Sequence, residues 1–343
     1  MKCKRWLALL LALLLLLCAT ACDSTSNHRD RDDDDDDAII DTNPSDNEQP
    51  GEGLPIPPIF EQNGNGPLLY RVIDDDGDIV WLFGSIHVGE ENYYPLPGYV
   101  TDALEHSDGL AVEFDIIAFE SNYQAQLGAA ALMMYLDGTT AKDHLSTEVY
   151  QQAVAAMRDL GIYNAAYELY KPVYWSSLID DTLRNTGETD LGIDRHLIQM
   201  AYDLDLPVLD VESPDYQYSM LASYSDGLQE LLLKTSVTRC NRVEEYNNEI
   251  RKLMDAWHQG NAKTLRSLLA STTDGLTQEE IMYMDEYNTK MLTDRDPIMT
   301  EFVTDALEDG EELFVCVGAA HVVGQNGVIE QLLAQGYTVE LVK

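Results

Sequence analysis

The chain shows two kinds of hydrophobic pattern. Near both ends, apolar residues follow one another in short unbroken runs, at 79–83 and 313–317. Such runs predict buried strands. Each is followed by a short amphipathic stretch and then by a second strand-like run, at 109–115 and 337–342. Each end of the chain therefore predicts a unit of strand, helix and strand.

The middle of the chain has a different period. From about residue 117 to 291, apolar residues recur every three or four positions, as in TEVYQQAVAAMRDLGI, which is typical of amphipathic helices. One run at 208–211 interrupts this pattern and predicts a short strand. The folded part, 55–343, is long enough for one large domain. We expect an α/β fold, in which a mixed sheet built from the two end units carries a helical insertion at about 117–291.

The two end units share a motif. Residues 79–89 read IVWLFGSIHVG and residues 313–324 read LFVCVGAAHVVG, so Gly84 and Gly318 each precede a histidine by three positions. Glycine lets a strand stop sharply and lets the backbone approach a ligand. His87 and His321 are then expected just past two strand ends, where ligands bind in α/β sheets. A single histidine in such a place is more often a structural residue, but two in matching contexts favour one shared site.

These segments resemble the TraB/GumN family (TraB/PrgY/GumN), which includes the Tiki-type membrane-associated metalloproteases. The resemblance runs from about Leu68 to Lys343, and its specific part is the two Gly-x-x-His segments with Glu113 between them. Weaker matches are the pair Val211-Glu212, the segment AWHQGN around Trp257, and LTDRDPIMTEFV with Arg295. The resemblance implies a metal-dependent peptidase.

Two imidazoles and a carboxylate are a frequent ligand set for a catalytic metal, because three protein ligands leave one position for water. Glu113 lies in AVEFD, where strand alternation would place Glu113 and Asp115 on one face. We therefore expect His87, Glu113 and His321 to bind a divalent transition metal, namely Mn, Co or Zn, that activates water. The alternative for Glu113 is a solvated strand face.

Glu212 and Arg295 are expected as further site members, mainly because of the resemblance. Glu212 would act as general base or support a ligand, and Arg295 would clamp a carboxylate or the transition state. An ordinary surface ion pair is the alternative for both. In family members the residue after this arginine is often Asn, whereas this chain has Asp296, so its role as an amide or an acid is open.

Other chemistries fit less well. The chain lacks the motifs His-Glu-x-x-His, Gly-x-x-x-x-Gly-Lys-Ser/Thr, Gly-x-Ser-x-Gly and Cys-x-x-Cys. Cys316 stands inside the apolar run FVCV and is interpreted as a small buried hydrophobe. A disulfide between Cys240 and Cys316 stays open.

The N-terminus indicates a location. Three basic residues precede an apolar run at 6–17, which is too short to span a bilayer and typical of a signal peptide. The run ends in Cys-Ala-Thr-Ala-Cys, which resembles a bacterial lipobox with Ala19 in place of the usual Leu. We expect residues 1–22 to be a lipoprotein signal peptide, cleaved before a lipidated Cys22. Ordinary signal cleavage nearby is the alternative.

Residues 23–54 contain the block RDRDDDDDD and few apolar side chains, so they predict a disordered acidic spacer. The formal net charge of the whole chain is −40, and the spacer, with twelve acids and two arginines, carries only part of it. Phosphate backbones would be repelled, so nucleic acid is excluded as a partner. A cationic, peptidic or neutral substrate is compatible, although the acidity is also explained by solubility alone.

These patterns favour a lipid-anchored, metal-dependent hydrolase at the extracytoplasmic face of the cell membrane. The resemblance implies that it acts on a peptide or protein substrate. The alternative is a non-enzymatic surface protein that binds or sequesters a peptide signal. A role as an envelope polysaccharide accessory is suggested only by the GumN name.

Overall fold

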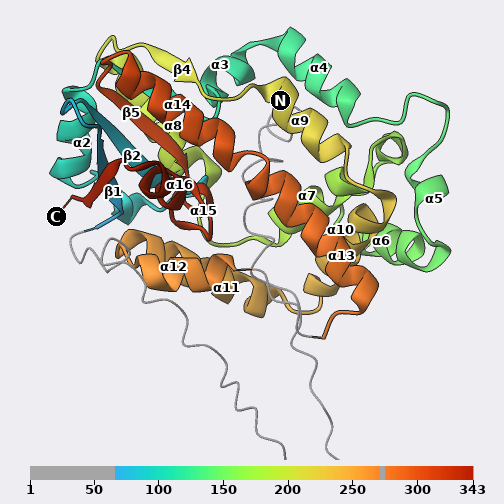
Figure 1. The fold of residues 1–343 in the computed structure, drawn as a ribbon. Helices are drawn as coiled ribbons and strands as arrows, with labels where there is room; N and C mark the ends of the chain where they lie inside the picture. Colours follow the sequence, from blue (N-terminus) through green and yellow to red (C-terminus); the bar gives the residue numbers. More distant parts are fainter. Residues whose placement is uncertain (1–65, 271–274, 343) are drawn as a thin grey trace, which may run out of the picture.

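The computed structural model describes residues 66–270 and 275–342 (Figure 1). The predicted signal peptide with Cys22, and the predicted spacer at 23–54, lie outside these residues.

One six-stranded mixed sheet forms the centre of the α/β fold. Its strands are β1 (Leu69–Ile73), β2 (Ile79–Ser85), β3 (Gly109–Val112), β4 (Val208–Asp210), β5 (Leu313–Gly318) and β6 (Thr338–Leu341). The strand order is β4-β3-β5-β2-β1-β6. β4, β3, β5 and β2 are parallel, whereas β1 is antiparallel to both β2 and β6. The predicted α/β class is therefore confirmed.

The middle of the chain is helical apart from β4, as its spacing predicts. Up to β4, the α-helices of the described chain are α2 (Gly98–Glu105), α3 (Ile116–Ser121), α4 (Tyr123–Leu132), α5 (Ala141–His144), α6 (Thr147–Asp159), α7 (Pro172–Leu183) and α8 (Ile193–Asp203). After β4 they are α9 (Pro214–Ala222), α10 (Asp226–Arg239), α11 (Val243–His258), α12 (Ala262–Leu269), α13 (Gln278–Asn288), α14 (Asp296–Glu308), α15 (Ala319–Val323) and α16 (Val328–Gln335). Shorter turns are η3 (Glu91–Tyr93), η4 (Ala165–Leu169), η5 (Thr189–Leu191) and the π turn η6 (Thr289–Thr293).

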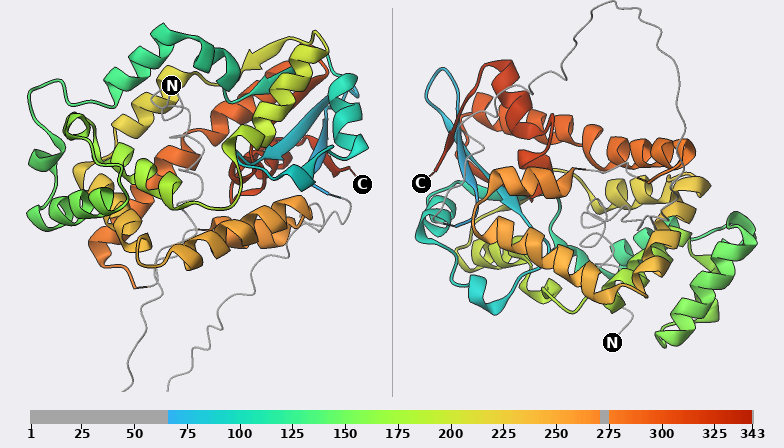
Figure 2. Two further views of the ribbon diagram at one scale, coloured as in Figure 1. Left: turned by 180° about the vertical axis from the view of Figure 1, so that it is seen from behind. Right: turned by 90° about the horizontal axis from the view of Figure 1, so that it is seen from below.

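Helices cover both faces of the sheet. α14 and α16 lie on one face, and α2 and α8 lie on the other (Figures 1 and 2). The central strands are consequently buried on both sides, and every residue of β3 and β5 is buried. Burial on both faces explains why these strands read as continuous apolar runs and do not alternate. Among the described residues, no helix combines the length and the hydrophobicity needed to cross a bilayer.

The two end units are less alike than their sequences predict. β3 returns beside β5 and parallel to it, whereas β6 returns to the sheet edge and pairs with β1. Directly after β5 the chain forms α15, and His321 is the third residue of that helix. His87 instead lies in an irregular segment after β2. The likeness of the units is local to the strand and its histidine.

Gly84 was expected to let the backbone approach a ligand, but its role in the structure is packing. A Cβ at this position would lie 3.1 Å from the Cα of Ala319, so the glycine allows β2 to pack closely against α15. The carbonyl oxygen of Gly84 also accepts a hydrogen bond of 2.7 Å from Nε1 of Trp257 on α11. The Trp257 segment thus fixes the end of β2 from the side.

The shared strand face expected for Glu113 and Asp115 is wrong. β3 ends at Val112, and Asp115 is the N-cap of α3, where its carboxylate accepts a hydrogen bond of 2.8 Å from the backbone N–H of Ala118. Aspartate is a favoured N-cap residue, and this local bond overrides the continuation of the strand. Only Glu113 is left for the site.

Candidate functional site

A polar residue follows each of the four parallel strands. Glu212 comes two residues after β4, Glu113 directly after β3, His321 three residues after β5, and His87 two residues after β2. Because the carboxyl ends of parallel strands meet at one sheet edge, the topology brings these four side chains to the same region. The charges of both histidines act on the Glu113 carboxylate, as expected for neighbours.

Arg295 joins this group from the start of α14. It follows the π turn η6, and its guanidinium lies between two carboxylates. Nη2 of Arg295 donates to Oε2 of Glu113 and to Oε2 of Glu212, both at 2.7 Å, and Nε donates to Oε1 of Glu212 at 2.9 Å. The Arg295 residue is 1% exposed. The alternative of a surface ion pair for Glu212 and Arg295 is therefore excluded.

The cluster controls the ionisation of Glu113. Burial alone would raise the pKa of its carboxyl group, but the charge of Arg295, with smaller contributions from the two histidines, holds that pKa well below its usual range. The carboxylates of Glu113 and Glu212 in turn raise the pKa of Arg295 above its usual value, although burial alone would lower it. Glu113 is thus a carboxylate throughout the neutral pH range.

Two further groups fix the Glu113 carboxylate. Nε2 of Gln217 donates to Oε2 of Glu113 at 2.9 Å and to Oε2 of Glu212 at 2.6 Å. The backbone N–H of Gly318 donates to Oε1 of Glu113 at 2.9 Å, which gives the second motif glycine a role at the site. A carboxylate has about four lone-pair positions, so these partners and Arg295 leave about one, on Oε1.

His321 is fully buried and is held by Asp296. Its Nδ1 lies 2.6 Å from Oδ1 of Asp296, and its Nε2 is a buried atom without a hydrogen-bond partner in the described chain. Burial raises the pKa of Asp296, partly offset by the hydrogen bond with His321. Asp296 therefore orients the His321 ring through a carboxyl oxygen, a contact that the amide oxygen of an Asn would also allow.

His87 has the same arrangement. Its Nδ1 lies 2.8 Å from Oδ2 of Asp194 in the first turn of α8, and its Nε2 is likewise buried without a partner. Burial alone would lower the pKa of His87, but the charge and hydrogen bond of Asp194, with the charge of Glu113, raise it to about 9. Without a metal, the His87 imidazole therefore binds a proton strongly.

Close backbone contacts place Asp194 against His87. A Cβ at Gly192 would lie 2.7 Å from the carbonyl oxygen of His87, and a Cβ at Gly89 would lie 1.9 Å from that of Leu191. Only glycine fits such approaches. The segment before α8 is thereby packed directly on the segment that carries His87.

The two histidines have the hydrogen-bonding arrangement that is common among metal ligands. In metal sites, a ligating imidazole usually donates its other N–H to a carboxylate, which fixes the ring orientation. Both His87 and His321 have this partner and a free Nε2. As the side chains stand, however, no group of three His, Cys, Asp or Glu residues within 66–270 and 275–342 is arranged to hold a metal ion. The carboxylate of Glu113 already accepts hydrogen bonds from Arg295, Gln217 and the backbone of Gly318. These bonds restrict its movement toward a metal ion.

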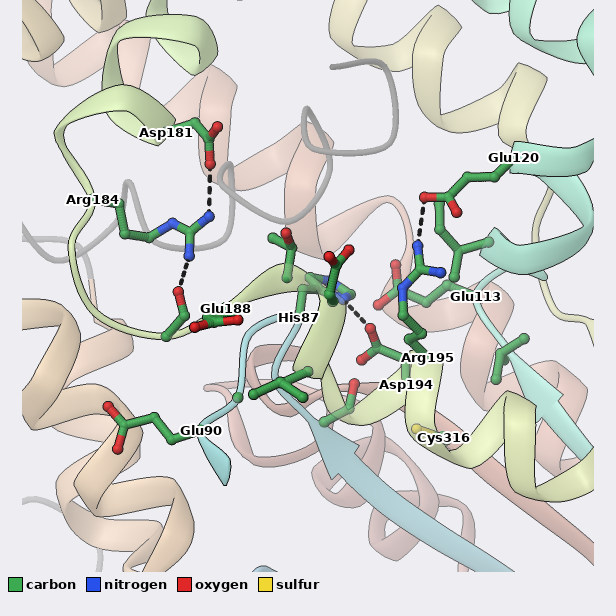
Figure 3. A pocket seen from close by; sticks show the side chains of 18 of the residues that line it. His87, Glu90, Glu113, Glu120, Asp181, Arg184, Glu188, Asp194, Arg195 and Cys316 are labelled. Atoms are coloured by element: carbon green, nitrogen blue, oxygen red, sulfur yellow. Dashed lines mark hydrogen bonds and ion pairs between the residues drawn. The ribbon is translucent and has the colours of Figure 1, made fainter. Parts of the chain in front are cut away.

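A cavity of about 820 Å³ opens in front of His87. Figure 3 shows His87 near its centre, with the pair Asp181 and Arg184 on one side and the pair Glu120 and Arg195 on the other. Cys316 is part of the wall, is 1% exposed, and has a pKa raised well above the usual value by burial. Cys240 and Cys316 are both free thiols, so the disulfide is absent from the structure.

Sequence reasoning missed Asp194 and Gln217. Asp194 is the second residue of α8, two positions after Gly192, and Gln217 lies one turn into α9, five residues after Glu212. Neither belongs to a motif that would separate it from a solvent-exposed helix residue. Their contacts arise only when the ends of β2 and β4 meet α8 and α9.

The chain belongs to the TraB/PrgY/gumN family, whose model matches residues 68–341. The resemblance stated from the sequence is therefore confirmed. The chain is similar to the uncharacterized protein YbaP of Escherichia coli K12, with 23% identity over 255 residues that cover 73% of this chain and 86% of that protein. It is equally similar to the uncharacterized protein YbaP of Shigella flexneri, with the same identity and coverage. No solved structure matches the chain significantly.

Proposed function

We propose that the protein is a metal-dependent hydrolase that cleaves peptides. The observation that carries this proposal is the pair of buried imidazoles, each with a carboxylate on Nδ1 and, within residues 66–270 and 275–342, no partner on Nε2. Leaving two buried ring nitrogens without partners is unfavourable unless a ligand binds them. His87 and His321 would hold the metal through Nε2, and Glu113 would use its remaining lone pair.

The charge around the two histidines suits a divalent cation. Glu113, Glu212, Asp194 and Asp296 supply four carboxylates, and Arg295 supplies one positive charge. With neutral imidazoles, three negative charges are left uncompensated in a largely buried cluster. A bound metal would neutralise most of them, and it would supply a water of lowered pKa together with polarisation of the substrate carbonyl.

The protein's own residues then have separate tasks. Asp194 and Asp296 hold the ring orientations, and the free Nε2 atoms must be neutral to bind a metal. Arg295 is enclosed between Glu113 and Glu212, which favours a positioning role over a direct clamp on substrate. Glu212 has both oxygens engaged by Arg295 and Gln217, which favours support of Glu113 over a role as general base. The cavity in front of His87 has room for several substrate residues.

We also propose that the protein is anchored by a lipid on Cys22 at the extracytoplasmic face of the membrane. The support is the signal-like run at 6–17 that leads into Ala-Thr-Ala-Cys. An acidic spacer would then separate the catalytic domain from the bilayer.

The hydrolase proposal is tested by measuring peptide cleavage after metal is removed with a chelator and again after metal is added back. The full-length chain, purified in detergent, is treated with EDTA and then supplied with Mn²⁺, Co²⁺ or Zn²⁺ before incubation with a mixed-sequence peptide library. We expect cleavage with at least one metal and none in EDTA. His87→Ala, His321→Ala and Glu113→Ala should each abolish it with little change in far-UV circular dichroism.

His106→Ala is the matched control, because His106 is exposed at the end of α2 and precedes β3, at the strand end opposite to the one that Glu113 follows. It should leave cleavage unchanged. Peptide binding that persists in EDTA, with no cleavage under any metal, would favour the non-enzymatic protein that sequesters a peptide.

A further inference from the structure

We propose that the cavity in front of His87 selects a lysine or arginine side chain of a peptide, which the carboxylates of Glu90 and Glu188 bind. That such a peptide is a substrate rests on the proposed function. Binding itself requires no metal and no cleavage, so it is tested separately.

The cavity wall carries a large excess of negative charge. Eight acidic side chains line it, against two arginines. Both arginines are already engaged, since Arg184 pairs with Asp181 and Arg195 pairs with Glu120. A concave wall of one sign focuses the electrostatic field and concentrates ligands of the opposite sign. The cavity therefore disfavours acidic ligands and favours cationic ones.

Glu90 and Glu188 are the acids best placed for direct contact. The backbone N–H of Gly89 donates to the carbonyl oxygen of Glu188 at 3.0 Å, and the N–H of Glu188 donates to that of Gly89 at 2.8 Å. This two-bond bridge holds both acids beside the His87 segment, and Figure 3 shows them on the same side of the cavity. Among the described residues, Glu90 accepts one long hydrogen bond, 3.3 Å from the Thr186 hydroxyl, and neither acid forms an ion pair. Glu90 is half-buried and Glu188 is exposed, so both carboxylates are accessible to a cation that enters the cavity.

Gln217 gives a second, independent indication of a ligand. Its side chain lines the same cavity and is fully buried, and its Oε1 has no hydrogen-bond partner within the part of the chain that the structure describes. Its Nε2 is already used by Glu113 and Glu212, so the oxygen is the atom left for a ligand. A buried acceptor without a partner requires a donor from outside. A peptide N–H or a cationic group supplies such a donor, whereas a carboxylate does not.

The acidity of the whole chain is the competing explanation for any preference for cations. The exposed turn between β1 and β2 offers a matched comparison, because Asp75 and Asp76 carry the same charge as Glu90 and Glu188. This turn lies at the opposite end of the seven-residue strand β2, about 20 Å from the cavity. At about 0.15 M ionic strength, the Debye length is about 8 Å, so the turn contributes little to binding in the cavity.

The test uses fluorescence anisotropy with the full-length chain in detergent, in EDTA and at about 0.15 M salt. Four fluorescein-labelled peptides of one length differ only at the central residue, which is Lys, Arg, Gln or Glu. We expect the Lys and Arg peptides to bind at least about tenfold more tightly than the Gln peptide, and the Glu peptide to bind least. The double variant Glu90→Gln/Glu188→Gln should reduce the preference for Lys over Gln to below about threefold. Asp75→Asn/Asp76→Asn should retain it.

Equal binding of the Lys and Gln peptides by the unmodified chain overturns the inference, and this comparison does not depend on how any variant folds. An equal loss of preference in the two double variants also overturns it, because the general field of the chain would then be the cause. Preference for Lys in EDTA without cleavage under any metal would refute only the hydrolase proposal.

Discussion

Replacing Arg295 by Met removes the positive charge that two buried carboxylates share. Removing one partner of a buried ion pair costs about 3–5 kcal/mol, because the remaining charge stays buried and uncompensated. Arg295 serves both Glu113 and Glu212, so we expect a value near the upper end of that range. At roughly 2–4 °C per kcal/mol for a large domain, a loss of about 5 kcal/mol should lower the melting temperature by roughly 10–20 °C.

The pH dependence of this loss tests its cause. In the native chain the pKa of Glu113 is held below its usual value, so the stability it contributes is present above about pH 4.5 and is lost as the pH falls further. In Arg295→Met the guanidinium is gone and burial raises that pKa, so Glu113 becomes protonated more readily. The difference in melting temperature between the two proteins should therefore shrink from pH 7 towards pH 5.

Differential scanning calorimetry in EDTA measures these effects. Arg71→Met is the matched control, because Arg71 forms an exposed ion pair with Glu340 that is worth about 0–1 kcal/mol. The triple variant Glu113→Gln/Glu212→Gln/Arg295→Met should recover much of the loss, since it leaves no unpaired buried charge. A melting temperature of Arg295→Met within about 2 °C of the unmodified chain would refute this account of the cluster.

Three further predictions concern location, the spacer and His87. On detergent phase separation we expect the unmodified chain to partition into the detergent, and Cys22→Ser to be soluble or unprocessed. Unchanged processing and partitioning of Cys22→Ser would rule out lipidation at this residue. Deleting residues 23–54 should leave the melting temperature nearly unchanged, because their composition cannot sustain a core; a drop of several degrees would mean that they pack on the domain. In EDTA, the raised pKa of His87 means that its stabilising contribution is present below about pH 6.5 and is lost as the pH rises through about 9. That loss should be roughly 3 kcal/mol by chemical denaturation and should disappear in Asp194→Asn.

The sequence predicted the fold class because its strongest signals come from burial. The runs at 79–83 and 313–317 are apolar because β2 and β5 lie at the centre of the sheet. A shorter apolar run at 208–211 located the edge strand β4, although its residues are half-buried or exposed. Pairing between distant strands is not encoded locally, so the different partners of β3 and β6 could not be predicted. Asp115 was misplaced for a related reason, since a strand end and a helix N-cap compete for the same residue.

For the candidate site, the sequence indicated the residues at strand ends but not how they are held. His87, Glu113, Glu212 and His321 follow apolar runs, so their common edge could be inferred from topology. Their hydrogen bonds depend on side chains from helices far away in sequence, such as Gln217, 104 positions from Glu113. The enclosure of Arg295 between two carboxylates is also a three-dimensional fact, since nothing near residue 295 indicates that its side chain is buried.

The most direct test of the central proposal is the metal content of the purified protein. The full-length chain is equilibrated with equal amounts of Mn²⁺, Co²⁺ and Zn²⁺, and unbound metal is removed by gel filtration. The metal that stays bound is then measured by inductively coupled plasma mass spectrometry. We expect about one metal ion per chain in the unmodified protein, a value near zero in His87→Ala/His321→Ala, and an unchanged value in His106→Ala. An unmodified chain that holds no metal, or a double variant that holds as much as the unmodified chain, would contradict the proposal that these two histidines form a metal site.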